Sequence, residues 1–168
     1  MSHDDLGSGP PILLLHSGVC NRRWGSRAEM VLAAVIASSA GVVAAPDLGV
    51  LDDELKVLLR SMRENFGATG RATMLGLLAE LDGTAADSVR ALIFTWGADL
   101  VAPVVSRARS RGEIGAGEVP VPVLALPFDL ARHELSMRGL LPEERIDVIV
   151  DTITVPLLRL HSGVGAAT

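Results

Sequence analysis

Two pairs of side chains have the spacing of metal ligands on a helix. Asp129 and His133 are four residues apart, and so are Asp147 and Asp151. Each pair would share one helical face, where carboxylate and imidazole groups can bind a divalent cation. Two ligands do not complete a metal site. We therefore expect no metal ion, and no other cofactor, in this protein.

The familiar motifs of catalysis are absent from the sequence. There is no glycine-rich phosphate loop, no Gly-x-Ser-x-Gly elbow and no cysteine paired with a histidine. Cys20 is the only cysteine, which excludes an internal disulfide and fits a reducing cytosol. We therefore expect a protein that is not an enzyme.

One dense basic cluster, formed by Arg22, Arg23 and Arg27, lies near the N-terminus. Its guanidinium groups could contact phosphates beside a DNA groove, and the alternative is a solvated helix start. The formal net charge of -5 argues against an overall nucleic-acid-binding surface. Phosphate contact is therefore expected only beside a complete DNA-reading element.

A second kind of candidate site is an apolar ligand cavity. Aromatic and methionine side chains would line it, and a polar residue such as Asp99, His133 or Arg63 would orient the ligand. The candidates are Met62, Phe66, Met74, Trp96, Asp99, Phe128 and His133. For each of them the alternative is an ordinary place in the core or on the surface.

A long helix from Thr84 to Gly112 is the element expected to position these side chains. Thr84 with Asp87 gives a start signal of the capping-box kind, and Gly112 gives a stop. Pro103 predicts a kink, or two helices end to end. The apolar stripe recurs at spacings of three and four: Val89, Leu92, Ile93, Trp96, Leu100, Val101, Val104 and Ala108.

Shorter helices are expected on both sides of this element. Ser26 with Glu29 forms a capping box, and 46–49 is a turn. The expected helices are 26 to about 41, 51–66 closed by Gly67, about 69–81, 123–138 closed by Gly139, and 143–160. The pattern predicts an all-α, bundle-like domain of about six to seven helices.

The last helix carries more apolar surface than one core requires. Val148 and Val155 form a second stripe beside the main stripe of Ile146, Ile149 and Ile153. We expect a two-fold dimer built from the last two helices, and the alternative is that both are central in the monomer. The expected interface residues are Leu124, Phe128, Leu135, Val148, Thr152 and Val155.

No segment is long and apolar enough to cross a membrane. The uncharged run from Gly9 to Val19 is short, contains Pro10 and Pro11, and has no basic leader before it. We therefore expect a cytoplasmic protein without membrane contact.

Four short segments are informative by their order and spacing: 21–32, 46–49, 111–113 and 146–158. Together they resemble the tetracycline-repressor (TetR) family. Residues 21–32 are similar to the end of its recognition helix and the start of its fourth helix. Pro46-Asp47-Leu48-Gly49 is similar to a Pro-Asp-Thr-Gly turn, and Arg111-Gly112-Glu113 to the Arg-Gly-Glu that closes its seventh helix. Residues 146–158 resemble its ninth helix, so the resemblance covers roughly 22–160.

The resemblance implies an N-terminal helix-turn-helix followed by a domain that dimerises and often binds a small ligand. The residues before Asn21 do not read as three helices. We therefore expect 1–20 to be an unassigned arm and 21–45 a remnant of the recognition-helix end with the linking helix. Residues 46–162 would be the ligand-binding and dimerisation domain, and 163–168 a frayed tail.

The resemblance also implies a function. It indicates a TetR-type transcriptional regulator, a repressor, represented by its ligand-sensing and dimerisation domain. The expected partners are a second copy of the chain, a small apolar ligand, and DNA only through a form with a complete helix-turn-helix. The alternative is a stand-alone dimerisation or small-molecule-binding module without DNA-binding activity.

Overall fold

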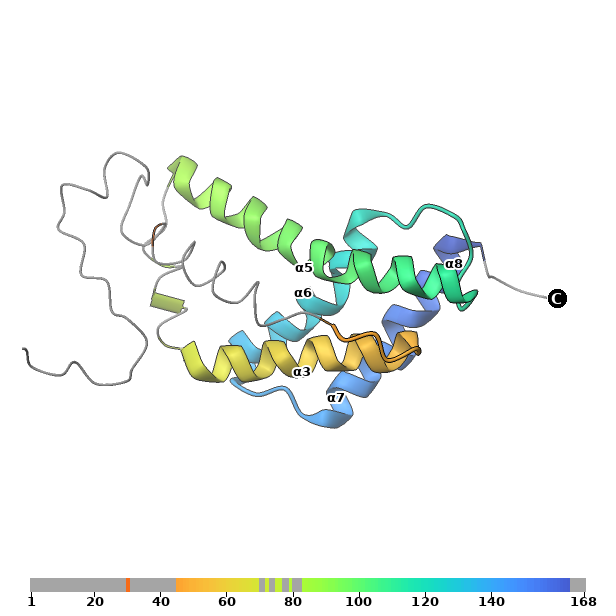
Figure 1. The fold of residues 1–168 in the computed structure, drawn as a ribbon. Helices are drawn as coiled ribbons and strands as arrows, with labels where there is room; N and C mark the ends of the chain where they lie inside the picture. The colour runs from red at the N-terminus through yellow and green to blue at the C-terminus, as the bar shows by residue number, and fades with distance from the viewer. Residues whose placement is uncertain are drawn as a thin grey trace, which may run out of the picture.

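The computed structural model describes residues 45–69 and 83–163, together with the isolated positions 30, 72, 75, 76 and 79. Every regular element within this part of the chain is a helix, so the predicted all-α class is confirmed (Figure 1). The elements are α3 (Leu51–Thr69), α5 (Gly83–Arg111), α6 (Val121–Arg138), α7 (Glu143–Asp147), the π-helix η1 (Val148–Thr154) and α8 (Val155–Ser162).

Helix α3 begins directly after the predicted turn, where Gly49 has a φ of 79° that favours glycine. Its first turn carries Asp52, Asp53 and Glu54, whose negative charges interact favourably with the positive end of the helix dipole. The helix continues to Thr69, past the Gly67 that was expected to close it.

Helix α5 is one continuous element of 29 residues with Pro103 inside it. The alternative of two helices end to end is therefore wrong. Pro103 cannot donate to the carbonyl of Asp99, but both residues are exposed, so water can replace that hydrogen bond. Gly112 ends the helix with a φ of 78°, as predicted.

Helix α6 begins two residues before the predicted start, with Pro120 as its N-cap and Pro122 in its first turn. Proline is tolerated there because the first backbone N–H groups of a helix have no intrahelical partner. Gly139 ends the helix with a φ of 75°, and its N–H donates to the carbonyl of Leu135. The predicted stop is therefore confirmed.

The last segment runs as three contiguous elements, α7, η1 and α8, from Glu143 to Ser162. The extent was predicted, but a regular α-helix was not found. In η1 the hydrogen bonds span five residues, and the buried Thr154 Oγ1 also donates to the carbonyl of Ile149 at 2.8 Å. This change of register alters which side chains face the core.

Val148 and Val155 illustrate the consequence. Residues seven apart share a face of an α-helix, but the π-helix between these two separates their directions. Val148 is 40% exposed, whereas Val155 is 1% exposed. The prediction that they form one surplus stripe is therefore wrong.

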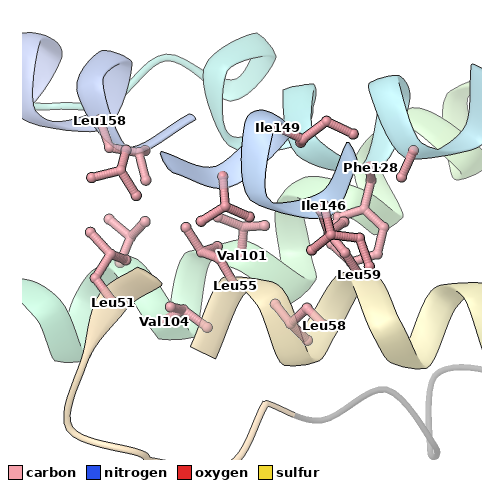
Figure 2. Close-up of a cluster of buried hydrophobic side chains, with 14 of the residues drawn as sticks. Leu51, Leu55, Leu58, Leu59, Val101, Val104, Phe128, Ile146, Ile149 and Leu158 are labelled. Carbon is pink, nitrogen blue, oxygen red and sulfur yellow. The ribbon is translucent and has the colours of Figure 1, made fainter. Parts of the chain in front are cut away.

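The core is built from aliphatic side chains of all the described helices together with Phe128, as the low aromatic content requires (Figure 2). Helix α6 packs most extensively against α5. Gly97 makes this approach possible, because a Cβ there would lie 3.0 Å from Phe128 Cβ. The central members are Leu51, Leu55, Leu58, Leu59, Val101, Val104, Phe128, Ile146, Ile149 and Leu158.

Several expected elements lie outside the described residues. These are the arm 1–20, the helix from 26 to about 41 apart from Met30, most of the helix at about 69–81, and the tail after Gly163. No helix in the described part is long and apolar enough to cross a membrane.

Candidate functional site

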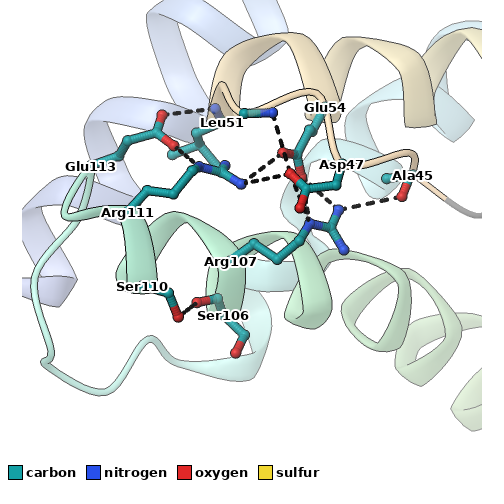
Figure 3. Close-up of polar contacts among 10 residues, drawn as sticks. Ala45, Asp47, Leu51, Glu54, Ser106, Arg107, Ser110, Arg111 and Glu113 are labelled. Carbon is teal, nitrogen blue, oxygen red and sulfur yellow. Dashed lines mark hydrogen bonds and ion pairs between the residues drawn. The ribbon is translucent and has the colours of Figure 1, made fainter.

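Five charged residues meet where the chain enters α3 (Figure 3). We call this group, formed by Asp47, Glu54, Arg107, Arg111 and Glu113, the junction network. Glu54 is fully buried, and its carboxylate lies between the two arginines of α5. The Nε of Arg107 donates to Glu54 Oε2 at 3.0 Å, and Arg111 Nη1 lies 3.0 Å from Glu54 Oε1. The buried charge is thus compensated from two sides.

Glu113 connects the end of α5 to the start of α3. Gly112 turns the chain back, so that Glu113 Oε2 accepts a hydrogen bond of 2.8 Å from the N–H of Leu51, the first residue of α3. Its other oxygen accepts from Arg111 Nε at 2.6 Å. Burial alone would raise the pKa of Glu113, but these two hydrogen bonds and the positive charges of Arg111 and Arg159 outweigh it and hold the pKa below its usual value. Glu113, in the turn after α5, therefore caps the N-terminus of α3.

The same arginines hold the segment before α3. Arg107 Nη2 donates to the carbonyl of Ala45 at 3.3 Å, and Arg111 Nη1 donates to Asp47 Oδ1 at 3.1 Å. The orientation with which the chain enters the domain at Ala45 is therefore set by the C-terminal turns of α5.

Sequence reasoning found the two ends of this network but not their contact. The Pro-Asp-Leu-Gly turn and the Arg-Gly-Glu ending were identified separately, and the structure joins them through Asp47 and Arg111. The sequence also contained a signal that Glu54 would be buried. Glu54 lies three residues after Leu51 and four before Leu58, on the inward stripe of α3.

The structure does not gather the seven predicted ligand residues into one cavity. Phe128 and Met62 are buried in the core, and Trp96 packs edge-on against Phe128 with ring centroids 5.4 Å apart. Asp99 and His133 are exposed. Met74 lies outside the described residues.

The structure has an open groove of about 450 Å³, and among the six predicted ligand residues that it describes, only Phe66 lines this groove. The groove lies between the ends of α3 and α6 and the connection to α7. Its lining is apolar except for one guanidinium, that of Arg63. The lining residues are Arg63, Phe66, Gly67, Leu135, Gly139, Leu140, Leu141 and Pro142.

The predicted dimer residues divide into two groups. Val148 and Thr152 are exposed, and Leu124 is half-buried. Phe128, Leu135 and Val155 are buried within the single chain, so the expectation that these three face a partner is corrected. The π-helix explains Val155, and the close packing of α6 on its neighbours explains the other two.

The charged pairs with metal spacing have other partners in the structure. Asp129 lies 2.8 Å from the guanidinium of Arg132, and Lys56 Nζ lies 2.9 Å from Asp147 and 2.8 Å from Asp151. Within the described ranges, no group of three potential ligands is placed to hold a metal ion. The basic cluster Arg22, Arg23 and Arg27 lies outside the described residues.

Within the described residues the chain forms an all-helical domain whose first helix, α3, is joined to the end of α5 by the junction network. Residues 45–153 match the family model described as tetracyclin repressor-like, C-terminal domain. Because this match spans more than half of the chain, the protein belongs to the TetR family of transcriptional regulators. The predicted TetR-type identity is confirmed.

Curated relatives agree with this assignment. An uncharacterised HTH-type transcriptional regulator of Mycobacterium tuberculosis is 27% identical over 149 residues, covering 84% of this chain and 71% of the relative. An uncharacterised HTH-type transcriptional regulator of Mycobacterium bovis has the same identity and coverage. No solved structure matches the chain significantly.

Proposed function

We propose that the described domain is the dimerising and ligand-responsive half of a TetR-type transcriptional regulator. Its family supplies the class of protein, and its relatives are named as HTH-type regulators. DNA contact would belong to a segment before Ala45, and the domain would control how that segment is presented. The alternative of a module without DNA-binding activity has no support from these relatives.

The junction network is the observation that carries this proposal. A regulator must convert a change inside one domain into a movement of another, which requires a defined mechanical connection. Arg107 and Arg111 supply such a connection, because each binds both the buried Glu54 and the segment that leads into α3. A displacement of the end of α5 would thus be passed to the preceding segment.

Hydrogen exchange tests the junction directly. Arg111→Met removes the contacts to Asp47, Glu54 and Glu113, so the amides of 47–51 should exchange at least about tenfold faster. Arg138→Met is the matched control, because the exposed Arg138 pairs with Glu134 on α6 and contacts no member of the junction network. Unchanged exchange at 47–51 in a folded Arg111→Met protein would contradict the proposal.

A homodimer is the second part of the proposal. Exposed apolar and neutral side chains recur on η1, α8 and the start of α6, elements that contact one another. Such surfaces are typical of obligate two-fold interfaces. The proposed interface residues are Val121, Leu124, Val148, Thr152 and Leu160.

Sedimentation velocity of the whole 168-residue chain tests the assembly. We expect a dimer at micromolar concentration, because a family domain with this exposed surface needs a partner to cover it. A monomer throughout the micromolar range would contradict the dimer.

A further inference from the structure

The groove beside Phe66 has the chemistry of a site for an amphipathic anion. Leu135 and Leu141 form a buried apolar floor, and Phe66 contributes an aromatic wall. Its volume of about 450 Å³ falls in the range of small-molecule pockets. Leu140 on the lining is 55% exposed, so the groove presents apolar surface that water would leave favourably.

At the polar end of the groove, two positively charged side chains contact a single negatively charged one. Arg60 and Arg63 both bind the single carboxylate of Glu143, the former through Nε at 2.6 Å and the latter through Nη1 at 3.1 Å. Two guanidiniums thus share one anion. Arg63 also donates to the carbonyl of Leu141 at 3.2 Å, which holds it over the groove.

Arg60 can hold the carboxylate of Glu143 without help from Arg63. The hydrogen bond that Arg60 donates to Glu143 raises the pKa of Arg60, and the charges of Asp147 and Asp53 raise it further. Because Arg60 donates to Glu143 Oε1 at 2.6 Å and Arg63 donates to the other oxygen at 3.1 Å, Glu143 can remain with Arg60 while Arg63 turns toward another carboxylate. A bidentate guanidinium–carboxylate pair would replace the single contact that Arg63 makes with Glu143.

We propose that this groove binds an aliphatic carboxylate, with the chain on Phe66, Leu135 and Leu141 and the headgroup on Arg63. The apolar lining favours an alkyl tail. Because Arg60 and Arg63 share the single carboxylate of Glu143, Arg63 can pair with the carboxylate headgroup of the ligand. This inference deepens the ligand-sensing part of the proposed function and rests on it for its biological meaning.

Calorimetric titration of the whole chain with decanoate tests the groove. We expect saturable binding at one site per chain, and about tenfold or more weaker binding of decanol, which lacks the charge. Decyltrimethylammonium, whose charge is opposite, should not bind. Equal affinity for decanoate and decanol, or no saturable binding of decanoate, would overturn the proposal.

Two variants locate the site. Arg63→Met keeps the apolar stem and should weaken decanoate binding about tenfold or more, whereas Arg138→Met removes an exposed arginine outside the groove and should leave it unchanged. Leu140→Glu places a like charge on the exposed rim and should also weaken binding, with Leu48→Glu, in the turn before α3, as its exposed control outside the groove. Binding unchanged in both Arg63→Met and Leu140→Glu would overturn the proposal.

The groove and the regulator proposal fail in different ways. A dimeric chain that does not bind decanoate would overturn the groove and leave the dimer intact. A monomeric chain that binds decanoate through Arg63 would support the groove and contradict the proposed assembly.

Discussion

Arg111, near the end of α5, donates to Asp47, which lies 64 residues earlier in the turn before α3, at 3.1 Å. This contact joins the two short motifs that resemble the TetR family. It also closes a chain of ion pairs through the buried Glu54 to the N-cap supplied by Glu113. The two motifs that resemble the TetR family are thus parts of one contact network, the junction network.

Glu54→Gln tests how much the junction network contributes to stability. Glutamine keeps the shape but removes the charge that faces Arg107 and Arg111, so we expect a loss of about 1.5–3 kcal/mol of unfolding free energy. Urea denaturation measures it. Glu64→Gln, at an exposed position of the same helix, should change stability by less than about 0.5 kcal/mol. Equal effects of the two variants would refute the role of Glu54.

The close approach of α5 and α6 predicts opposite effects at two glycines. Gly97→Ala places a methyl group 3.0 Å from Phe128 Cβ, which cannot swing aside, so overpacking should cost about 1–3 kcal/mol. Gly67→Ala meets nothing within 4 Å and should stabilise α3 by up to about 1 kcal/mol. Thermal unfolding of both variants checks the contrast, and a stabilised Gly97→Ala protein would show that the helices are less tightly packed than described.

Thr154 predicts a cost for a nearly isosteric change in the π-helix. Thr154→Val removes the hydroxyl that donates to the carbonyl of Ile149 in a fully buried setting, so we expect a loss of about 1–3 kcal/mol. Thr95→Val removes the same kind of contact, from Thr95 Oγ1 to the carbonyl of Ala91, at an exposed position of α5 and should be close to neutral. Chemical denaturation compares them; if Thr154→Val matches the parent, the hydroxyl does not support the π-helix.

Glu143 predicts an acid-dependent contribution to stability. Its hydrogen bond from Arg60, with that from Arg63, holds the pKa of Glu143 below the usual 4.5. A depressed pKa gives stability that is fully present above about pH 4.5 and is lost as the pH falls through the folded-state value. Glu143→Gln should therefore be less stable than the parent at neutral pH, and the difference should shrink in acid. Denaturation at neutral pH and at a pH below 4.5 measures the difference in unfolding free energy between the two proteins. A difference that grows in acid would contradict the assigned direction of the pKa shift.

The fold was largely predictable, because helix starts and stops are local signals. Gly112 and Gly139 stop α5 and α6 where the sequence predicted, and the α3 stripe of Leu51, Leu55 and Leu58 is buried. The π-helix was not predictable from periodicity, because the spacing of Ile146, Ile149 and the residues after them also satisfies a regular helix. The junction network was missed as a unit, since pairing between Asp47 and Arg111 is a long-range contact that no local pattern encodes.

The site was less predictable for the same reason. Large side chains such as Phe128 and Met62 suit a core as well as a cavity, and three-dimensional packing places both in the core. The groove depends on where α3 and α6 end relative to each other. The sequence showed Arg63 as a polar residue on an apolar helix. It did not show that Arg63 shares the carboxylate of Glu143 with Arg60.

The most direct test of the account is sedimentation velocity of Val148→Glu beside Val50→Glu. Both valines are similarly exposed, at 40% and 44%, but only Val148 lies on the proposed interface. Because a two-fold axis brings the new carboxylate in twice, the account predicts a folded Val148→Glu monomer and a Val50→Glu dimer at micromolar concentration. A Val148→Glu dimer as tight as the parent would contradict it and remove η1 from the interface.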